Sequence, residues 1–198
     1  FFSQGDCLTA VHRERVVRAA TSSFLAHGYR SSVDEIARRA GVAKQTVYQH
    51  FPSKDELFKE VARDLTQRVL VELDAGPRDL RAALLRVARA YRKRVLGAQG
   101  IATLRTVVPE VPRFPALARA MYAGGAGALV ARLAAFLSRA MGAGELRRDD
   151  PELAAEIFLG MLVGHDRLKR LFGLQCDDKA EARRTAQIVD CFLRAYAP

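Results

Sequence analysis

Four neighbouring side chains near the start of the chain could contact a nucleic acid. They are polar and are spaced so that one helix would turn them away from its apolar contacts: Lys44, Gln45, Tyr48 and Gln49. Lysine and tyrosine can contact phosphates, and glutamine can present paired donor and acceptor groups to base edges in the major groove. Lys54 adds a cation at the start of the next expected helix, where free backbone N–H groups favour a phosphate. These residue types at this spacing predict contact with duplex DNA.

The elements that would position these side chains form a helix-turn-helix. The capping-box spacing of Ser32 and Glu35 predicts the start of a short helix that runs to residue 40, and a second short helix is expected over 43–51. Gly41, between the two, can adopt the positive φ that a tight turn requires. Two short helices joined by a tight glycine turn are typical of helix-turn-helix DNA-binding proteins.

Helical periodicity continues along the rest of the chain, and alternating strand patterns are almost absent. The expected fold class is therefore all-α, with an N-terminal three-helix domain and a larger C-terminal helical domain. Residues 1–8 are expected to be an arm without fixed structure or a remnant of cloning, and 9–52 to be the helix-turn-helix domain. Residues 53–198 would then be the larger domain, in which a helix over 53–75 links the two, and the capping-box spacing of Ser53 and Glu56 predicts the start of this helix.

Prolines and glycines predict where the helices of the larger domain begin and end. Apolar stripes predict helices over 80–95, 151–172 and 180–196. Pro109, Pro112 and Pro115 predict a broken helical region, which is followed by a short helix over 116–122. A glycine-rich joint is expected next, at Gly124, Gly125 and Gly127, before a helix that runs through Met141.

The helix expected over 151–172 is apolar on more than one side, so it must be buried from two directions. Its own domain can cover one side, and the other side requires a partner, which predicts a homodimer. The residues expected at the dimer interface lie on this helix and on the last one: Leu159, Gly160, Val163, Gly164, Ile188 and Phe192.

The net charge of +10 suggests a polyanionic partner, but the distribution of the charge is more informative than its size. Residues 1–60 carry 9 Lys+Arg against 7 Asp+Glu, whereas residues 61–198 carry 23 against 15. Because the basic excess avoids the expected DNA reader, the alternative of a basic protein that coats DNA without regard to sequence is disfavoured.

Two groups of basic residues are expected to be solvated surface. The first lies on the first helix: Arg13, Arg15 and Arg18. The second is expected to be mostly a charged face, with only Arg94 near the apolar edge of its helix: Arg86, Arg89, Arg92, Lys93 and Arg94.

No catalytic, metal or cofactor pattern accompanies these features. Cys7, Cys176 and Cys191 are widely spaced and lack any Cys/His ligand grouping, so neither a zinc site nor a disulfide framework is expected. His165 and Glu110 could supply the acid and base groups of an all-helical enzyme, but no nucleophile motif or phosphate loop accompanies them. No apolar run approaches the roughly 18 to 20 residues that span a bilayer, and the start of the chain is unlike a secretion signal. A cytoplasmic protein without cofactor, metal or membrane partner is expected.

The stretch 13–58 resembles the DNA-binding domain of the TetR family of transcriptional regulators. The resemblance rests on Gly28-Tyr29, Val33-Asp34-Glu35-Ile36-Ala37, Ala40-Gly41-Val42, Thr46-Val47-Tyr48 and His50-Phe51-Pro52-Ser53-Lys54. Further along, Arg113-Phe114-Pro115 with Leu117-Ala118, and Ala154-Ala155 with Gly160 and Gly164, resemble the subgroup with an AefR-like C-terminal domain.

The resemblance implies a homodimeric regulator, most often a repressor, that a small-molecule effector releases from a pseudo-palindromic DNA operator. It also implies DNA contacts from the third helix and the start of the fourth: Lys44, Gln45, Thr46, Tyr48, Gln49, His50 and Lys54. Ser32, before the second helix, is expected to add a phosphate contact. Two departures from the family pattern matter. Ala43 replaces a common serine, so a hydroxyl cap is absent there, and Gln45 places a base-reading side chain where many relatives have glycine.

The larger domain would then hold the effector pocket, which is expected to be largely apolar. The residues expected to line it are Tyr91, Leu104, Arg105, Phe114, Met121, Tyr122, Phe158, Met161, Leu162 and His165. The same residues could equally be ordinary core. The sequence names neither the effector nor the operator, and it does not distinguish a repressor from an activator.

Overall fold

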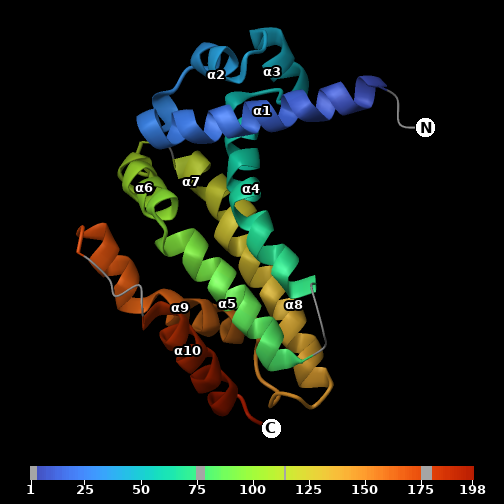
Figure 1. Ribbon diagram of the computed structural model, residues 1–198, viewed down its shortest axis with the longest axis vertical. Helices are drawn as coiled ribbons and strands as arrows, with labels where there is room; N and C mark the ends of the chain where they lie inside the picture. The colour runs from blue at the N-terminus through green and yellow to red at the C-terminus, as the bar shows by residue number, and fades with distance from the viewer. Residues whose placement is uncertain (1–3, 75–78, 114, 175–179) are drawn as a thin grey trace. The chain divides into compact units, whose positions relative to one another are not determined.

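The described residues of the chain are helices joined by turns. The computed structural model describes residues 4–74, 79–113, 115–174 and 180–198, and no strand occurs among them (Figure 1). The predicted all-α fold class is confirmed. None of the helices in these ranges is long and apolar enough to cross a membrane.

The chain divides into two compact units whose boundaries differ from the predicted domain boundary. The first unit contains residues 1–64 and 102–124, and the second contains residues 65–101 and 125–198. The boundary therefore falls inside the linking helix rather than at its start, because the first turns of that helix pack on the DNA-reading helices.

The first unit contains the predicted helix-turn-helix, which consists of α2 (Val33–Ala40) and α3 (Lys44–His50), together with two flanking helices. The flanking helices are α1 (Gln4–His27) and the first part of α4 (Lys54–Asp74). Because α1 begins at Gln4, the expectation of an unstructured arm over 1–8 is wrong from residue 4 onward.

The predicted helix starts of α2 and α4 are confirmed by their side-chain caps. The Ser32 hydroxyl accepts a hydrogen bond from the Glu35 backbone N–H at 3.1 Å. The Ser53 hydroxyl accepts one from the Glu56 N–H, also at 3.1 Å. Each cap satisfies one of the backbone N–H groups that the first turn of a helix leaves without a partner.

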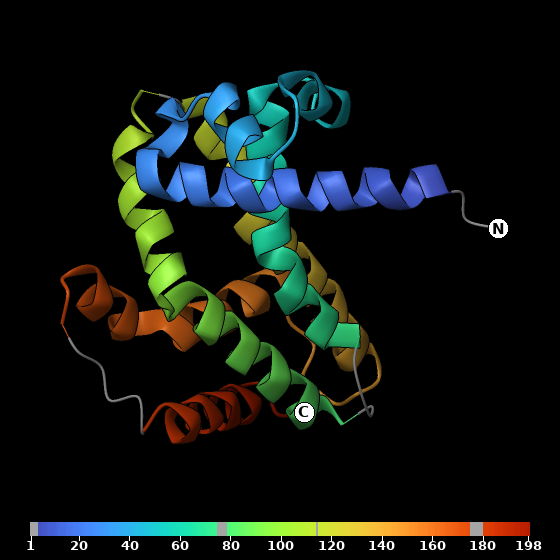
Figure 2. The same ribbon diagram turned by 45° about the horizontal axis from the view of Figure 1, so that its top comes forward.

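The core of the first unit lies where α1 meets α2 and α3, a contact visible in Figures 1 and 2. Phe24 of α1 and Phe58 of α4 pack edge to face, with ring centroids 4.7 Å apart, and Tyr29 packs on Phe58 at 5.5 Å. The other fully buried apolar residues of this core are Val16, Ala20, Ile36 and Leu57. This core fixes the start of α4 against the end of α1.

The segment after residue 97 is more helical than its prolines and glycines predict. Helix α6 (Ala98–Val107) begins directly after Gly97, and a short 3-10 helix over Val108–Glu110 precedes α7 (Pro115–Tyr122). The glycine-rich stretch is a π-helix (Ala123–Gly127) between α7 and α8 (Ala128–Gly142), so the chain stays helical at the predicted joint, and the boundary between the two units falls there. Glycine lowers helix propensity but does not forbid a helix that packing stabilises.

The second unit is a bundle built around one long helix. It contains α5 (Leu80–Leu96), α8, α9 (Pro151–Leu171) and α10 (Glu181–Ala195), and α9 packs on α5, α8 and α10. The fully buried side chains of its core come from all four helices: Leu84, Val87, Leu129, Leu133, Leu137, Phe158, Leu162, Val189 and Phe192. These contacts define the frame of the larger unit.

Helix α9 contains a break that its sequence does not signal. Gly164 has φ 32° and ψ −135°, which is outside the helical region, and α9 bends there (Figure 2). Such backbone angles favour glycine, because an L side chain is strained at positive φ. The break interrupts the regular hydrogen bonding of α9 close to the Leu162 carbonyl.

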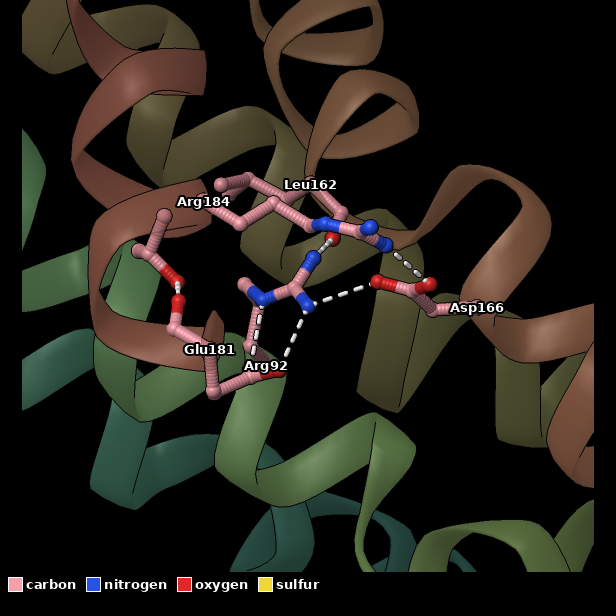
Figure 3. Close-up of polar contacts among 6 residues, drawn as sticks. Arg92, Leu162, Asp166, Glu181 and Arg184 are labelled. Atoms are coloured by element: carbon pink, nitrogen blue, oxygen red, sulfur yellow. Dashed lines mark hydrogen bonds and ion pairs between the residues drawn. The ribbon is translucent and has the colours of Figure 1, made fainter. Parts of the chain in front are cut away.

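The side chain of Arg92 lies beside this part of α9, between Leu162, Asp166 and Glu181 (Figure 3). Its guanidinium donates a hydrogen bond to the Leu162 carbonyl. It also donates to the Glu181 carboxylate at 2.7 and 2.8 Å and to the Asp166 carboxylate at 2.8 Å. Arg184 donates to the other oxygen of Asp166 at 2.6 Å. One buried cation therefore connects α5, α9 and α10.

The expectation that Arg94 is the inward-facing basic residue of α5 is wrong. Arg92 is 2% exposed, whereas Arg94 is half-buried. Arg92 shares a helix face with Leu84, Ala88 and Leu96, which are buried at intervals of four residues. Its charge is tolerated on this face because carboxylates from two other helices surround it.

The carboxylate of Asp166 stays ionised inside this network. Burial raises the pKa of Asp166, but hydrogen bonds from Arg92 and Arg184 outweigh burial and hold the pKa below its usual value. The network therefore keeps opposite charges paired in the interior.

Replacing Arg92 with alanine is expected to lower the free energy of unfolding by about 3 kcal/mol, because it removes one of the two cations that pair with the buried Asp166 carboxylate and the cation that pairs with Glu181. Urea unfolding followed by circular dichroism measures the change. Arg89→Ala is the matched control, since Arg89 lies on the same helix but is exposed, and a change within about 0.5 kcal/mol is expected. Equal losses in the two variants would contradict a structural role for the Arg92 network.

Candidate DNA-binding interface

The turn between α2 and α3 depends on one glycine. Gly41 has φ 64° and ψ 41°, the left-handed conformation that the sequence predicts. The Val42 N–H donates to the Ala37 carbonyl at 3.1 Å, which closes the end of α2. A Cβ at Gly41 would lie 2.5 Å from Nη2 of Arg15, so a larger residue would also displace that side chain. The turn therefore requires glycine for two reasons.

Helix α3 presents a polar face and buries one apolar side chain. Val47 is 1% exposed and packs into the core of the first unit. The side chains of Lys44, Gln45, Tyr48 and Gln49 are exposed, with Tyr48 at 42%. Those of Thr46 and His50 are half-buried. The four polar residues singled out by their spacing thus lie on the solvent side of α3.

The cation at the head of α3 is paired within the protein. Nζ of Lys44 lies 2.9 Å from a carboxylate oxygen of Asp34 on α2, and both side chains are at least half exposed. An exposed pair of this kind contributes little to stability. It does orient the Lys44 side chain, and a phosphate could compete for the ammonium because the pair remains open to solvent.

Lys54 occupies a different place from the one that its sequence position suggests. Its ammonium donates to the Tyr29 carbonyl and lies 4.1 Å from the centroid of the Tyr29 ring. Burial lowers the pKa of Lys54 below its usual value. The Tyr29 hydroxyl donates to the Asp55 carboxylate, and burial together with this bond raises the pKa of Tyr29. Lys54 therefore connects the start of α4 to the end of α1.

His50 and Ser32 lie beside the polar face of α3 and have partners of their own. Burial, and then the nearby His12 and Arg13, lower the pKa of His50, so its imidazole is neutral at neutral pH. The Ser32 hydroxyl is exposed while it caps α2. His50 can therefore contribute neutral hydrogen bonds rather than positive charge.

Two arginines of α1 hold the reading helices, which the sequence did not indicate. Arg13 forms a 2.6 Å ion pair with Glu60 of α4 and lies 5.3 Å from the centroid of the Phe51 ring. Arg15 donates to the Gly41 carbonyl at 3.3 Å. Both were expected to be solvated, and their partners lie too far along the chain for periodicity to reveal them.

The residues expected to line an effector pocket are divided between the two units. Four belong to the first unit: Leu104, Arg105, Met121 and Tyr122. Five belong to the second: Tyr91, Phe158, Met161, Leu162 and His165. Phe114 lies outside the described residues. Phe158 and Leu162 are fully buried in the core of the second unit, whereas Tyr122 and His165 are exposed.

Half of the residues expected at a dimer interface belong instead to the core of the protomer. Leu159, Val163 and Phe192 are buried within the second unit, and Ile188 is half-buried. Gly160 and Gly164 are exposed, as an interface requires. Exposed large apolar residues occur on both sides of the break at Gly164: Leu153 and Ile157 before it, and Leu168 and Phe172 after it. Sequence periodicity alone does not separate these two faces.

Helix α3 exposes a polar face and packs on the core through the buried Val47, and a larger helical unit follows it. This arrangement is typical of a helix-turn-helix DNA-binding regulator. The family description "Bacterial regulatory proteins, tetR family" matches residues 16–61, and "AefR-like transcriptional repressor, C-terminal domain" matches residues 82–198. The chain belongs to the TetR family of transcriptional regulators, which are not enzymes, so His165 and Glu110 are assigned no catalytic role.

Known relatives agree with this assignment. An uncharacterised HTH-type transcriptional regulator of Mycobacterium tuberculosis is 38% identical over 107 residues, which cover 53% of this chain and 51% of the relative. The chain thus spans about half the length of the curated relatives it matches first. Among solved structures, the flavonoid-responsive regulator FrrA is 34% identical with a TM-score of 0.73, covering 94% of this chain and 97% of FrrA. A TetR-family regulator of Mesorhizobium loti is 28% identical with a TM-score of 0.76, covering 96% and 98%.

Ala43→Ser is expected to stabilise the protein by about 0.5 to 2 kcal/mol. Ala43 precedes α3 with extended backbone angles, φ −69° and ψ 150°, and its side chain makes no cap. A serine in this conformation can accept a hydrogen bond from the first turn. Thermal unfolding measures the gain, and Ala43→Val, which adds a side chain without a hydroxyl, is the control. A gain of the same size in both variants would contradict a capping effect.

Proposed function

We propose that this chain is a sequence-specific repressor that binds a pseudo-palindromic operator as a homodimer and leaves it when a small-molecule effector binds. The observation that carries the proposal is the exposed polar face of α3, held by the Gly41 turn and the buried Val47. The repressor role is supported by the match to AefR-like repressors. An activator, the role named for FasR of Mycolicibacterium smegmatis, which is 48% identical over 50 residues, is the alternative.

In this function the side chains of α3 divide into two roles. Gln45 would read base edges, because its amide offers a donor and an acceptor at the exposed start of the helix. Lys44 would leave Asp34 for a phosphate, which positions the helix without reading sequence. Tyr48, Gln49, Thr46 and His50 would complete the contact surface, and Ser32 would add a phosphate contact from the start of α2.

Gln45→Ala is expected to relax preference at one or two operator base pairs by roughly 1 to 3 kcal/mol. Lys44→Ala is expected to weaken binding to every duplex about equally and to make the salt dependence shallower by about one unit. Fluorescence anisotropy on the operator and on singly substituted operators measures both effects. Gln187→Ala, at an exposed position of α10 in the second unit, is the matched control and should bind every duplex as the wild type does. An even loss across all duplexes for Gln45→Ala would assign Gln45 to positioning instead.

Dimerisation would use the exposed side of α9. The apolar side chains of Leu153, Ile157 and Leu168 on α9 are left uncovered by the protomer, and the exposed Gly160 and Gly164 lie between them. A two-fold dimer would place its two α3 helices about one turn of DNA apart, roughly 34 to 36 Å, which matches the spacing of palindromic half-sites.

Gly160→Leu is expected to weaken dimerisation without destabilising the protomer. A Cβ built at Gly160 meets no atom of the protomer within 4 Å, so the new side chain would meet only a partner. Sedimentation velocity at micromolar concentration measures the monomer fraction. Ala135→Leu, at an exposed position of α8, is the control and should remain dimeric. A dimer of undiminished affinity in Gly160→Leu would place the interface elsewhere.

Effector control is supported by the name of the relative FrrA, a flavonoid-responsive regulator. It is also supported by the course of α6, whose first residues belong to the second unit and whose last residues belong to the first. Near its end, the Thr106 methyl group lies 3.5 Å from the position that a Cβ on Gly28 would occupy. An effector that binds two positions of α6 unequally would shift the equilibrium between them.

A further inference from the structure

Two adjacent cavities in the second unit have cationic linings. The larger has a volume of about 640 Å³ and is lined by four basic side chains of α5, together with residues 97–99 at the start of α6: Arg86, Arg89, Lys93 and Arg94. The smaller, of about 440 Å³, shares Arg89 and Lys93 with it. Volumes of roughly 300 to 1,000 Å³ are usual for small-molecule sites. Arg89 and Lys93 are exposed, as the sequence predicts for this charged face, and the structure adds that the face borders a cavity of this size.

The positive charge in the larger cavity is not balanced by its own lining, which contains no Asp or Glu. Helix α5 carries six Lys and Arg and no acidic residue between Leu80 and Leu96. Arg81 pairs with Asp190, and Arg92 pairs with Glu181 and Asp166. Arg89 and Lys93 have no ion-pair or hydrogen-bond partner among the residues that the structure describes. Within the described part of the chain, the two cations common to both cavities therefore have no carboxylate partner, since Glu181 in the smaller cavity pairs with Arg92.

Ordinary helix electrostatics explain only part of this pattern. Lys93 and Arg94 lie in the last turn of α5, where cations interact favourably with the helix dipole. Arg86 and Arg89 lie in the middle of the helix, where that benefit is absent. Arg86, Arg89 and Lys93 follow at intervals of three and four residues on one face, and like charges at this spacing destabilise a helix. A bound anion would offset this repulsion.

The start of α6 lies at the lining of the same cavity. The Gly97 carbonyl accepts from the Ile101 N–H at 3.0 Å, so the first turn of α6 begins at the cavity lining. The first N–H groups of a helix have no partner inside the helix, and its dipole favours an anion there. A Cβ at Gly100 would collide with the Arg94 carbonyl, so glycine allows this turn to pack against the end of α5.

From these observations we infer that the larger cavity binds a small organic anion with at least two negative charges, carried by carboxylate or phosphate groups. Val69 and Ala90 in the lining would contact its apolar part. That this anion is the effector is a further step, which rests on the proposed function. Because α6 starts at the cavity and ends in the DNA-reading unit, an anion that draws its first turn toward α5 would act on the same helix that carries Thr106.

Isothermal titration calorimetry of the full chain without DNA tests the site, with inorganic pyrophosphate and citrate as the two probes. Arg89→Gln/Lys93→Gln is expected to weaken binding at least tenfold, and the affinity of the wild type is expected to fall as the salt concentration rises. The matched control is Arg148→Gln/Lys169→Gln, which removes one exposed arginine and one exposed lysine of the same unit outside both linings. It should bind as the wild type does.

The outcomes separate the site from its role. Binding of pyrophosphate alone, or of citrate alone, identifies the phosphate or the carboxylate class. If neither probe binds, or if the two double variants weaken binding equally, the proposed anion site is wrong. Operator binding by the wild type without any probe tests the proposed function independently. At constant ionic strength, the bound probe is expected to lower operator affinity in the wild type and not in Arg89→Gln/Lys93→Gln. Binding of the probe without this effect would keep the site and overturn its role as the effector site.

Discussion

The DNA-reading surface depends on how a helix of seven residues is held in place. An isolated helix of this length is unstable in water, because nucleation costs more than so few hydrogen bonds return. Helix α3 has one fully buried anchor, Val47, and no side-chain cap at its start. Its orientation must therefore come from its neighbours. Arg15 holds the Gly41 carbonyl in the preceding turn, and Arg13 connects Phe51, directly after α3, to Glu60 of α4. The polar face of α3 is free to contact DNA because other elements supply its stability.

Helix α5 uses its cations in two different ways. On its buried face Arg92 is surrounded by carboxylates and by the Leu162 carbonyl near the break in α9, so its charge holds three helices together. On its outer face Arg89 and Lys93 meet no such partners among the described residues. The contrast follows from position alone, since all three are strong bases on one helix. Where the fold supplies carboxylates the cation is structural, and where it supplies none the cation is available to a ligand.

Local features of the fold could be predicted from the sequence, and long-range ones could not. The caps at Ser32 and Ser53 and the turn at Gly41 depend on residues at most five positions apart, and the structure contains them as predicted. Arg92 was misassigned because its carboxylate partner Glu181 lies 89 residues away. Leu159 and Val163 were assigned to an interface because periodicity identifies an apolar face without saying what covers it. The exposed polar face of α3 was found because its residue types and spacing are local.

The free energy for regulation must come from a difference between two states, because a ligand with equal affinity for both shifts nothing. Repulsion among the cations of α5 is one source of such a difference. A bound anion relieves this repulsion, and it binds best in the state in which the first turn of α6 lies close enough to α5 to contact the same ligand. Couplings of about 1 to 3 kcal/mol are typical of allosteric proteins, so the ligand need only distinguish modest displacements of that first turn. A helix is stiff along its axis, and a displacement at Gln99 is therefore not absorbed before Thr106. In the proposed mechanism, the length of α6 converts neutralised charge in one unit into altered packing against Gly28 in the other.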